Sequence, residues 1–298
     1  MIAAKIRPLT PLFGAEVSGL DLSRGITAQE AAAIQALIDT HGLLVFKEQE
    51  LDEECQVRFS SNFGPLQQSI SVARPSESRR YRREDVSDIS NVDEDGNLLD
   101  PQHVRRQLQL ANLLWHSDNS FRDPSSSYTF LFAKAVPPAG GETEFADMRA
   151  AFDDLDQSQK DQLETMSAVH SLARSRSLAG GSPLTDEELR QFPGRVQPLV
   201  LQLAATGRKA IYIGSHADRV VGLDADESRQ LLDRLNAHAT LPKYVYSHSW
   251  QRGDLVMWDN RVTLHRGRPF DERLHRRDLR RTSVADCQDR EQARKVCT

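Results

Sequence analysis

Trp115-His116-Ser117-Asp118 is the stretch of sequence that decides the fold and the chemistry of this chain. Residues 111–115 predict a short buried strand, and residues i and i+2 of an extended backbone face the same side, so His116 and Asp118 can chelate one metal ion. His265, which follows Trp258-Asp-Asn-Arg-Val-Thr-Leu, completes two imidazoles and one carboxylate, the ligand set of non-haem Fe(II). Such ligands cover one face of an octahedron, and the open face indicates oxidative chemistry with a chelating co-substrate and dioxygen.

The pattern His-x-Asp also arises by chance, and this chain contains a second copy, His216-Ala217-Asp218. The second copy lies in a polar turn that precedes the helical pattern of residues 224–238, so Asp218 is better explained as a turn residue than as a metal ligand. A lone histidine beside an apolar run is more often a packed or capping residue. The assignment of His116 and Asp118 therefore needs support from other segments.

An arginine-dense segment near the C-terminus supplies part of that support. If residues 275–284 are extended, Arg277, Leu279 and Arg281 share one face of the strand. Two guanidinium groups on an inward face require anions, because a buried unpaired charge costs several kcal/mol, and carboxylates are their natural bidentate partners. The alternative is a solvated basic strand, which accounts for Arg273, Arg276 and Arg280. It does not require one arginine on each side of Leu279.

The ordered motifs resemble a known family. The segments are LWHSDNSF (114–121), PPAGGETEFADMRAA (137–151), GDLVMWDNR to His265 (253–265) and RRDLRRT (276–282). They are similar to the 2-oxoglutarate-dependent dioxygenases of the taurine dioxygenase family, and SDISNV (87–92) and YIGSHA (212–217) are most similar to its members that act on 2,4-dichlorophenoxyacetate. The resemblance covers residues 8–285 in order. It implies a mixed α/β, mainly β fold with a double-stranded β-helix (jelly roll) core flanked by helices.

The resemblance also implies roles for individual residues. His116, Asp118 and His265 hold Fe(II), Thr143 and Arg277 bind the distal carboxylate of the co-substrate 2-oxoglutarate, Arg281 holds the anionic group of the prime substrate, Asn112 lines the substrate pocket, and His216 lies near it. One position departs from the pattern, because the phenoxyacetate members carry a lysine in the loop after Phe-Gly-Pro-Leu and residues 69–75 here contain none. Either Arg74 replaces that lysine or Arg281 acts alone.

Short strands separated by turns predict, without the resemblance, a β-sandwich or a jelly roll flanked by helices. Helices are predicted at 31–41, behind a Thr27 capping box, and at 52–63, 146–155, 158–166 and 224–238; strands are predicted at 43–46, 128–136, 196–203, 209–213, 244–247, 254–257 and 281–285. Residues 67–110 read as a long mobile excursion over the active site rather than a core element. We expect one domain over residues 1–298 with a polar tail from about 286.

The composition disfavours nucleic-acid binding and a membrane-spanning helix. The net charge of -5 disfavours a nucleic-acid surface, and no run approaches the roughly 20 apolar residues of a membrane helix. Cys55, Cys287 and Cys297 are odd in number and widely spaced, which indicates free thiols in the cytoplasm. The resemblance implies a homo-oligomer, a dimer or larger.

The reaction implied by the resemblance consumes 2-oxoglutarate and dioxygen and releases succinate and carbon dioxide. The expected substrate is a small organic anion, with an aryloxyalkanoate such as 2,4-dichlorophenoxyacetate first, cleaved at its ether bond to a phenol and glyoxylate during the breakdown of aromatic compounds. The alternatives are a taurine-like sulfonate, an N-acyl amino acid, or a non-catalytic relative that only binds an organic anion.

Overall fold

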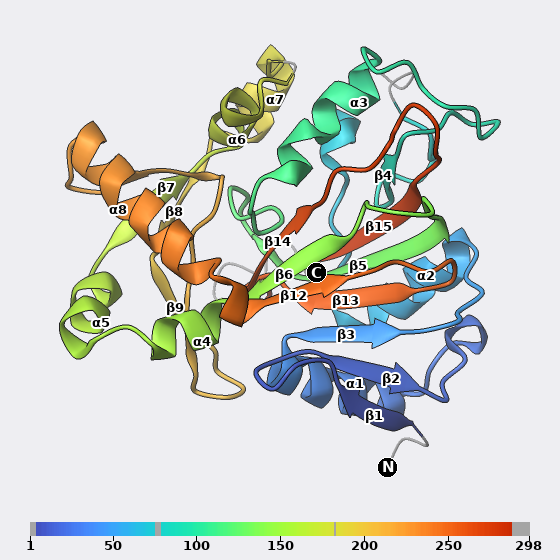
Figure 1. The fold of residues 1–298 in the computed structure, drawn as a ribbon, viewed down its shortest axis with the longest axis horizontal. Coiled ribbons are helices and arrows are strands. Elements are labelled where there is room, and N and C mark those ends of the chain that lie inside the picture. The colour runs from blue at the N-terminus through green and yellow to red at the C-terminus, as the bar shows by residue number, and fades with distance from the viewer. Residues whose placement is uncertain (1–3, 75–78, 182, 288–298) are drawn as a thin grey trace.

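The computed structural model describes residues 4–74, 79–181 and 183–287. Its largest sheet has seven strands in the order β1-β2-β3-β13-β5-β15-β4 (Figure 1). These strands are β1 (Lys5–Pro8), β2 (Ala15–Ser18), β3 (Leu43–Phe46), β4 (Ser87–Ser90), β5 (Ser126–Ala135), β13 (Leu255–Asp259) and β15 (Asp278–Ala285). All neighbouring strands in this sheet are antiparallel except β2 and β3, which are parallel.

Side chains of the central strands alternate between two cores, as the period of a strand requires. On one face, Val45, Leu131 and Leu279 pack with Phe145 of a second sheet. On the other face, Leu44, Phe46, Phe130 and Phe132 pack with Ile34, Ile38 and Phe59 from two helices. Strands buried on both faces read as nearly continuous apolar runs, which explains why residues 43–46 and 128–136 gave clear strand patterns.

The two helices on the outer face are α1 (Ala28–His41) and α2 (Glu53–Ser60). Thr27 and Glu30 form the capping box that the sequence predicted, and Gly42 ends α1 in a left-handed conformation with φ 71°. A Cβ at Gly42 would lie 2.8 Å from the guanidinium of Arg149, so the turn into β3 requires glycine both for its backbone angle and for space.

The second face of the jelly roll is a sheet in the order β12-β6-β14, with two smaller sheets beside it. Their strands are β6 (Thr143–Asp147), β12 (Val245–His248) and β14 (Thr263–Gly267), then β7 (Ser167–His170), β8 (Arg195–Pro198) and β11 (Ala217–Val220), then β9 (Val200–Gln202) and β10 (Lys209–Ile211). Phe145 on β6 points to the core between the two large sheets, whereas its neighbour Ala146 joins a third core on the far side.

The remaining helices cover this second face and one end of the molecule (Figure 1). They are α3 (Val104–Gln109), α4 (Met148–Asp153), α5 (Gln157–Glu164), α6 (Leu172–Ala179), α7 (Asp186–Gln191) and α8 (Ala225–Ala239). Leu232 and Leu235 of α8 and Phe152 of α4 are buried in the third core with Ala146. The predicted fold, a double-stranded β-helix flanked by helices, is confirmed.

Three local predictions are wrong. The strand predicted at 111–115 is wrong at 111–113, because residues 110–113 form a single 3-10 turn and the chain is extended only from Leu114 onward. The helix predicted at 146–155 begins at Met148, because the residues before it pair in β6. The stretch 67–110 includes β4, which pairs with β15 and forms an edge of the main sheet, so it is not only an excursion.

None of the helices in the described ranges combines the length and the hydropathy of a transmembrane segment. Cys55 is a free thiol, as its isolated position predicted. The predicted polar tail from about 286 and Cys297 lie, apart from residues 286 and 287, outside the described residues.

Candidate metal centre and adjoining cavities

His116 and His265 are brought together by an antiparallel bridge between the segment after Leu114 and β14. The backbone N–H of each donates to the carbonyl of the other, at 3.0 and 2.9 Å. His265 pairs with Phe145 in the register of β14 with β6, so its imidazole points to the inner core, where it stacks on the ring of Phe145 and lies tilted against the ring of Trp258. Pairing of distant segments, rather than sequence proximity, therefore places the second imidazole.

The three predicted ligand side chains form one cluster, whose ligand atoms all lie within 4.8 Å of one another. Asp118 Oδ1 is 3.9 Å from His116 Nε2, and Asp118 Oδ2 is 3.7 Å from His265 Nε2. His116 Nδ1 donates to the Leu114 carbonyl at 2.7 Å, so the lone pair of this imidazole is on Nε2, which faces the cluster. All three residues are buried.

Buried polar groups hold the Asp118 carboxylate in place. Thr129 on the inner face of β5 donates to Asp118 Oδ2 at 2.9 Å, and Asn260 accepts from the Asp118 backbone N–H at 3.0 Å. The amide of Asn260 is itself fixed, because it donates to Thr129 and accepts from the Trp258 indole. Outer contacts of this kind orient a metal ligand before the metal binds.

The electrostatics suit a dication. Burial acts to raise the pKa of the Asp118 carboxyl, but Arg281, His265 and His116 outweigh burial, and the net result is a pKa below the ordinary value. Burial lowers the pKa of His116 and of His265, so both imidazoles are neutral at physiological pH. An ionised carboxylate and two neutral imidazoles are the protonation states that a metal requires, and this donor set fits Fe(II).

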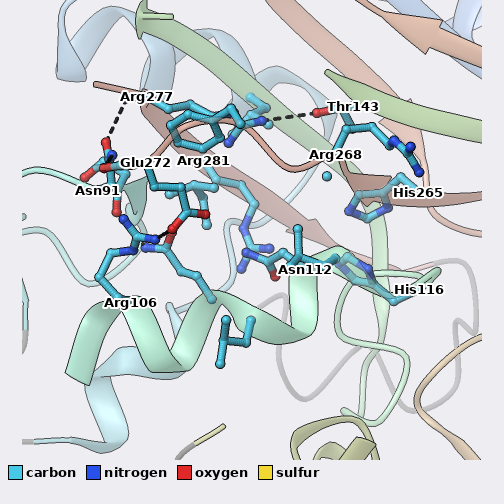
Figure 2. Close-up of a pocket in the computed structure, with 18 of the residues that line it drawn as sticks. Asn91, Arg106, Asn112, His116, Thr143, His265, Arg268, Glu272, Arg277 and Arg281 are labelled. Atoms are coloured by element: carbon cyan, nitrogen blue, oxygen red, sulfur yellow. Dashed lines mark hydrogen bonds and ion pairs between the residues drawn. The ribbon is translucent and has the colours of Figure 1, made fainter. Parts of the chain in front are cut away.

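Arg277 lies in a second polar cluster, which Figure 2 shows beside the ligands. Its Nη2 donates to Thr143 Oγ1 at 3.3 Å and its Nε donates to the Gly141 carbonyl at 3.0 Å. The Trp250 indole donates to the same Thr143 hydroxyl at 2.9 Å. Burial lowers the pKa of Arg277 to about 10, an effect that Glu142 partly opposes, so the guanidinium stays charged and attracts an anion.

Asn91 fixes the backbone on which Arg277 stands. Its Oδ1 accepts from the Arg277 N–H at 2.8 Å, and its Nδ2 donates to the carbonyls of Glu272 and His275 at 3.1 and 2.8 Å. The Asn91 side chain, which is 3% exposed, thus ties the loop after β14 to the end of β4. No role was predicted for Asn91, although it lies in the quoted motif SDISNV.

Two cavities meet at the metal cluster. The first, which we call the cofactor cavity after the role proposed for it below, has an empty volume of about 810 Å³ that includes open solvent at its mouth, and Thr143, Arg277, His265 and Arg268 line it. The second, which we call the substrate cavity, measures about 970 Å³ on the same basis. Both are lined by Ile89, Gln109, Asn112, His116 and Arg281. A ligand in either cavity therefore reaches the same metal ligand, His116.

Arg281 stands on the inner face of β15, in line with Leu279, as the strand period predicted, and its Nη1 donates to Asp118 Oδ1 at 2.6 Å. Arg280 on the opposite face was expected to be solvated, and this expectation is wrong. It is 4% exposed and its guanidinium donates to Gln56 and to the carbonyls of Leu51 and Asp52.

The other predicted pocket residues also line the substrate cavity. His216 is buried, its ring centroid is 6.0 Å from that of His116, and burial lowers its pKa to about 3. Arg74 donates twice to Glu188, at 2.9 and 2.8 Å, so its charge is already paired. No role was predicted for Trp250 or Asn260 either. Asn91 and Asn260 lie inside quoted motifs, which is the only signal for them in the sequence, and Trp250 precedes the motif that begins at Gly253.

Known proteins are similar to this chain in sequence and in fold. A family model for the taurine catabolism dioxygenase TauD, TfdA family, matches residues 5–283. The chain is 43% identical to the alpha-ketoglutarate-dependent 2,4-dichlorophenoxyacetate dioxygenase of Cupriavidus pinatubonensis, over 94% of this chain and 96% of that protein. It is 37% identical to the (S)-phenoxypropionate/alpha-ketoglutarate-dioxygenase of Sphingobium herbicidovorans, over 90% of this chain and 91% of that one.

Among solved structures, AAD-2 in complex with Mn(II) and N-oxalylglycine matches with a TM-score of 0.86 and 40% identity, covering 95% of this chain and 97% of that chain. The region from His116 to Arg281, which contains every predicted iron and 2-oxoglutarate residue, lies inside the span of the family model.

Proposed function

This chain belongs to the TauD/TfdA family of Fe(II)- and 2-oxoglutarate-dependent dioxygenases, and we propose that its prime substrate is an aryloxyalkanoate. The hydroxyl is placed on the carbon that carries the ether oxygen. The product is a hemiacetal-type species, which collapses to a phenol and an oxoacid, glyoxylate when the substrate is an aryloxyacetate. The observation that carries this proposal is a metal cluster shared by two anion-attracting cavities, in a chain 43% identical to a 2,4-dichlorophenoxyacetate dioxygenase.

On this proposal His116, Asp118 and His265 hold the iron, and Arg277 with Thr143 binds the distal carboxylate of 2-oxoglutarate. When bound, Fe(II) and 2-oxoglutarate supply the activation of dioxygen that hydroxylates a C–H bond. The Arg277 guanidinium is desolvated, so a carboxylate that replaces its lost water is held strongly and in a planar geometry. The protein contributes position, which is where much of the rate of such a reaction arises.

The substrate cavity fixes which C–H bond faces the metal. Arg281 offers its remaining N–H groups to the substrate carboxylate, and the Nε of this side chain is buried with no partner in the described part of the chain. Asn112 and His216 line the cavity on the side of His116. Arg74 has a structural role in this arrangement, because Glu188 already takes its charge. Arg281 therefore acts without the lysine that phenoxyacetate members carry.

The proposal is tested by anaerobic titration with Fe(II) and 2-oxoglutarate, followed by exposure to oxygen. Succinate and phenol would be measured across aryloxyacetates, aryloxypropionates, taurine-like sulfonates and N-acyl amino acids. We expect succinate in a one-to-one ratio with phenol for an aryloxyalkanoate. Succinate coupled only to a sulfonate or an N-acyl amino acid would show that the substrate class is wrong, and iron binding with no coupled product in any class would favour an anion-binding relative.

We also propose that the chain is one dioxygenase domain that works in the cytoplasm as a homo-oligomer, without a nucleic-acid or membrane partner. The span of the family model, residues 5–283, supports the single domain, and the net charge of -5 supports the absence of a nucleic-acid partner. Sedimentation of the purified protein measures the oligomeric state directly.

A further inference from the structure

The substrate cavity carries more positive than negative charge. Among its described lining residues there are six arginines but only three carboxylates. The arginines are Arg74, Arg79, Arg80, Arg105, Arg176 and Arg281, and the carboxylates are Asp88, Asp118 and Glu188. Apolar side chains, among them Ile70, Leu108, Phe121 and Leu172, line the same space. The cavity thus suits a ligand with an apolar body and acidic groups.

Most of these arginines have a carboxylate at hydrogen-bond distance. Arg74 is paired with Glu188, Arg80 with Asp278, Arg105 with Asp88, and Arg281 with Asp118, at 2.8, 2.7, 2.8 and 2.6 Å. Asp278 comes from β15 just outside the cavity lining. Arg79 and Arg176 are different, because in the described ranges neither has a carboxylate oxygen at hydrogen-bond distance.

Arg176 stands on α6 and its side chain is only 9% exposed. Its Nη2 lies 4.0 Å from Glu188 Oε1, which is beyond hydrogen-bond distance, and its buried Nη1 has no partner within the described residues. Glu188 cannot serve it better, because both of its oxygens already accept hydrogen bonds from Arg74, and one of them also accepts from the Thr185 N–H. Arg74 and Arg176 therefore share one negative charge.

A buried guanidinium without a full partner is unfavourable, because it has lost water and gained no hydrogen bond in return. Burial lowers the pKa of Arg176; Glu188 opposes this effect and the neighbouring charge of Arg74 adds to it. Arg176 lines the cavity and faces no other described acidic group within ion-pair distance. An anion that enters the cavity would supply the missing hydrogen bonds.

We infer that Arg176 binds a second anionic group of the prime substrate, distinct from the carboxylate held at Arg281. This inference rests on the proposed function and narrows its substrate class. The preferred substrate is an aryloxyalkanoate whose aromatic body carries a carboxylate or another acidic substituent. Arg281 on β15 then orients the end that reacts, and Arg176 on α6 binds the opposite end.

The test compares phenoxyacetate with the isomeric carboxyphenoxyacetates, which differ from it only by the second acidic group. We expect wild-type kcat/KM to be about tenfold or more higher for at least one carboxyphenoxyacetate, the gain from one charge-assisted hydrogen-bonding group. Arg176→Met should remove this preference and leave phenoxyacetate turnover and the KM for 2-oxoglutarate unchanged. Arg176→Lys should restore part of the preference. Calorimetric titration of the same ligands under anaerobic conditions should show the same order of Kd.

The matched control is Arg174→Met on the same helix, because Arg174 is not among the described residues that line the substrate cavity. It should keep the wild-type preference. The melting temperature of substrate-free Arg176→Met should equal or exceed that of the wild type, since the substitution removes a buried unpaired charge. A folded Arg176→Met variant with an unchanged preference ratio would overturn the inference, and so would an equal loss of activity toward both substrates.

Failure of this inference differs from failure of the proposed function. If phenoxyacetate and the carboxyphenoxyacetates give succinate at equal kcat/KM, only the second anion site is refuted. If no aryloxyalkanoate of either kind gives succinate while another class does, the substrate class itself is refuted.

Discussion

The cofactor cavity and the substrate cavity share Asn112, His116 and Arg281, but the guanidinium groups that line only one of them differ in how fully their N–H groups are hydrogen-bonded. In the cofactor cavity, the Arg277 side chain donates to Gly141 and Thr143, and Arg106 forms an ion pair with Glu272 (Figure 2). In the substrate cavity, buried N–H groups of Arg79 and Arg176 have no partner in the described part of the chain. On the proposed function, hydrogen bonds orient the Arg277 guanidinium before 2-oxoglutarate binds, whereas buried donors of the substrate cavity are left for the substrate to satisfy.

The largest predicted loss of activity comes from a substitution in the metal cluster. Asp118→Ala removes the only carboxylate of the described cluster, and we expect iron-dependent succinate formation to fall by at least about a thousandfold. Asp218→Ala, in the second His-x-Asp copy, is the matched control and should keep wild-type activity. Iron content and succinate yield would be measured for both. A similar loss in both variants would contradict the assignment of the ligands.

The next test concerns the different roles proposed for Arg277, which directly precedes β15, and for Arg281 on β15. Arg277→Met should raise the KM for 2-oxoglutarate by about a hundredfold, because it removes the charged partner of a buried carboxylate, and should leave the KM for the prime substrate nearly unchanged. Arg281→Met should chiefly raise the KM for the prime substrate. Arg276→Met, at an exposed neighbouring position, is the control. Equal losses of both affinities in the two variants would refute these different roles.

Replacement of Asn91 should have a smaller effect, which acts through Arg277. Asn91→Ala leaves two carbonyls and one backbone N–H of the 272–277 loop without their partners, and we expect a rise of about tenfold in the KM for 2-oxoglutarate with little change in kcat. Initial rates at saturating and limiting 2-oxoglutarate measure this split. A fall in kcat alone would show that Asn91 does not position the co-substrate site.

The smallest predicted effect is a change in the pH dependence of stability caused by His170. His170 is fully buried, its Nδ1 contacts Ser120 at 2.9 Å, and its Nε2 has no partner among the described residues. Burial lowers its pKa to about 3, below the ordinary value of 6.5. The unfolded chain therefore binds a proton that the folded protein does not, so stability falls as pH decreases from 6.5 toward 3, by at most about 1.4 kcal/mol per pH unit.

His170→Phe keeps an aromatic ring against Tyr212 and removes the titrating group. Between pH 6.5 and pH 4, urea unfolding should show a shallower loss of stability for this variant than for the wild type. Parallel curves over that range would mean that the imidazole is hydrogen-bonded through water and titrates normally.

The sequence by itself was enough to predict the reaction class of this protein, because its ordered motifs match those of a family and the strand period shows which neighbouring side chains share a face. The period of two along a strand places Arg277, Leu279 and Arg281 on one face, and the ordered motifs predicted the jelly roll and the residues that are proposed to bind iron and 2-oxoglutarate. The same reasoning failed at residues 110–113, where the apolar run forms a 3-10 turn, and at Arg280, whose burial depends on packing under α2.

Only the tertiary structure decided how the substrate cavity is charged. The separation of Arg176 from Glu188 depends on α6, α7 and the segment of Arg74 packing together, and the position of Asn91 depends on the pairing of β4 with β15. These contacts join residues far apart in the chain, and residue type alone does not indicate whether a buried arginine finds a partner. The reaction class follows from the ordered motifs that the chain shares with its family, whereas the proposed preference for a second acidic group follows from non-local contacts around one cavity.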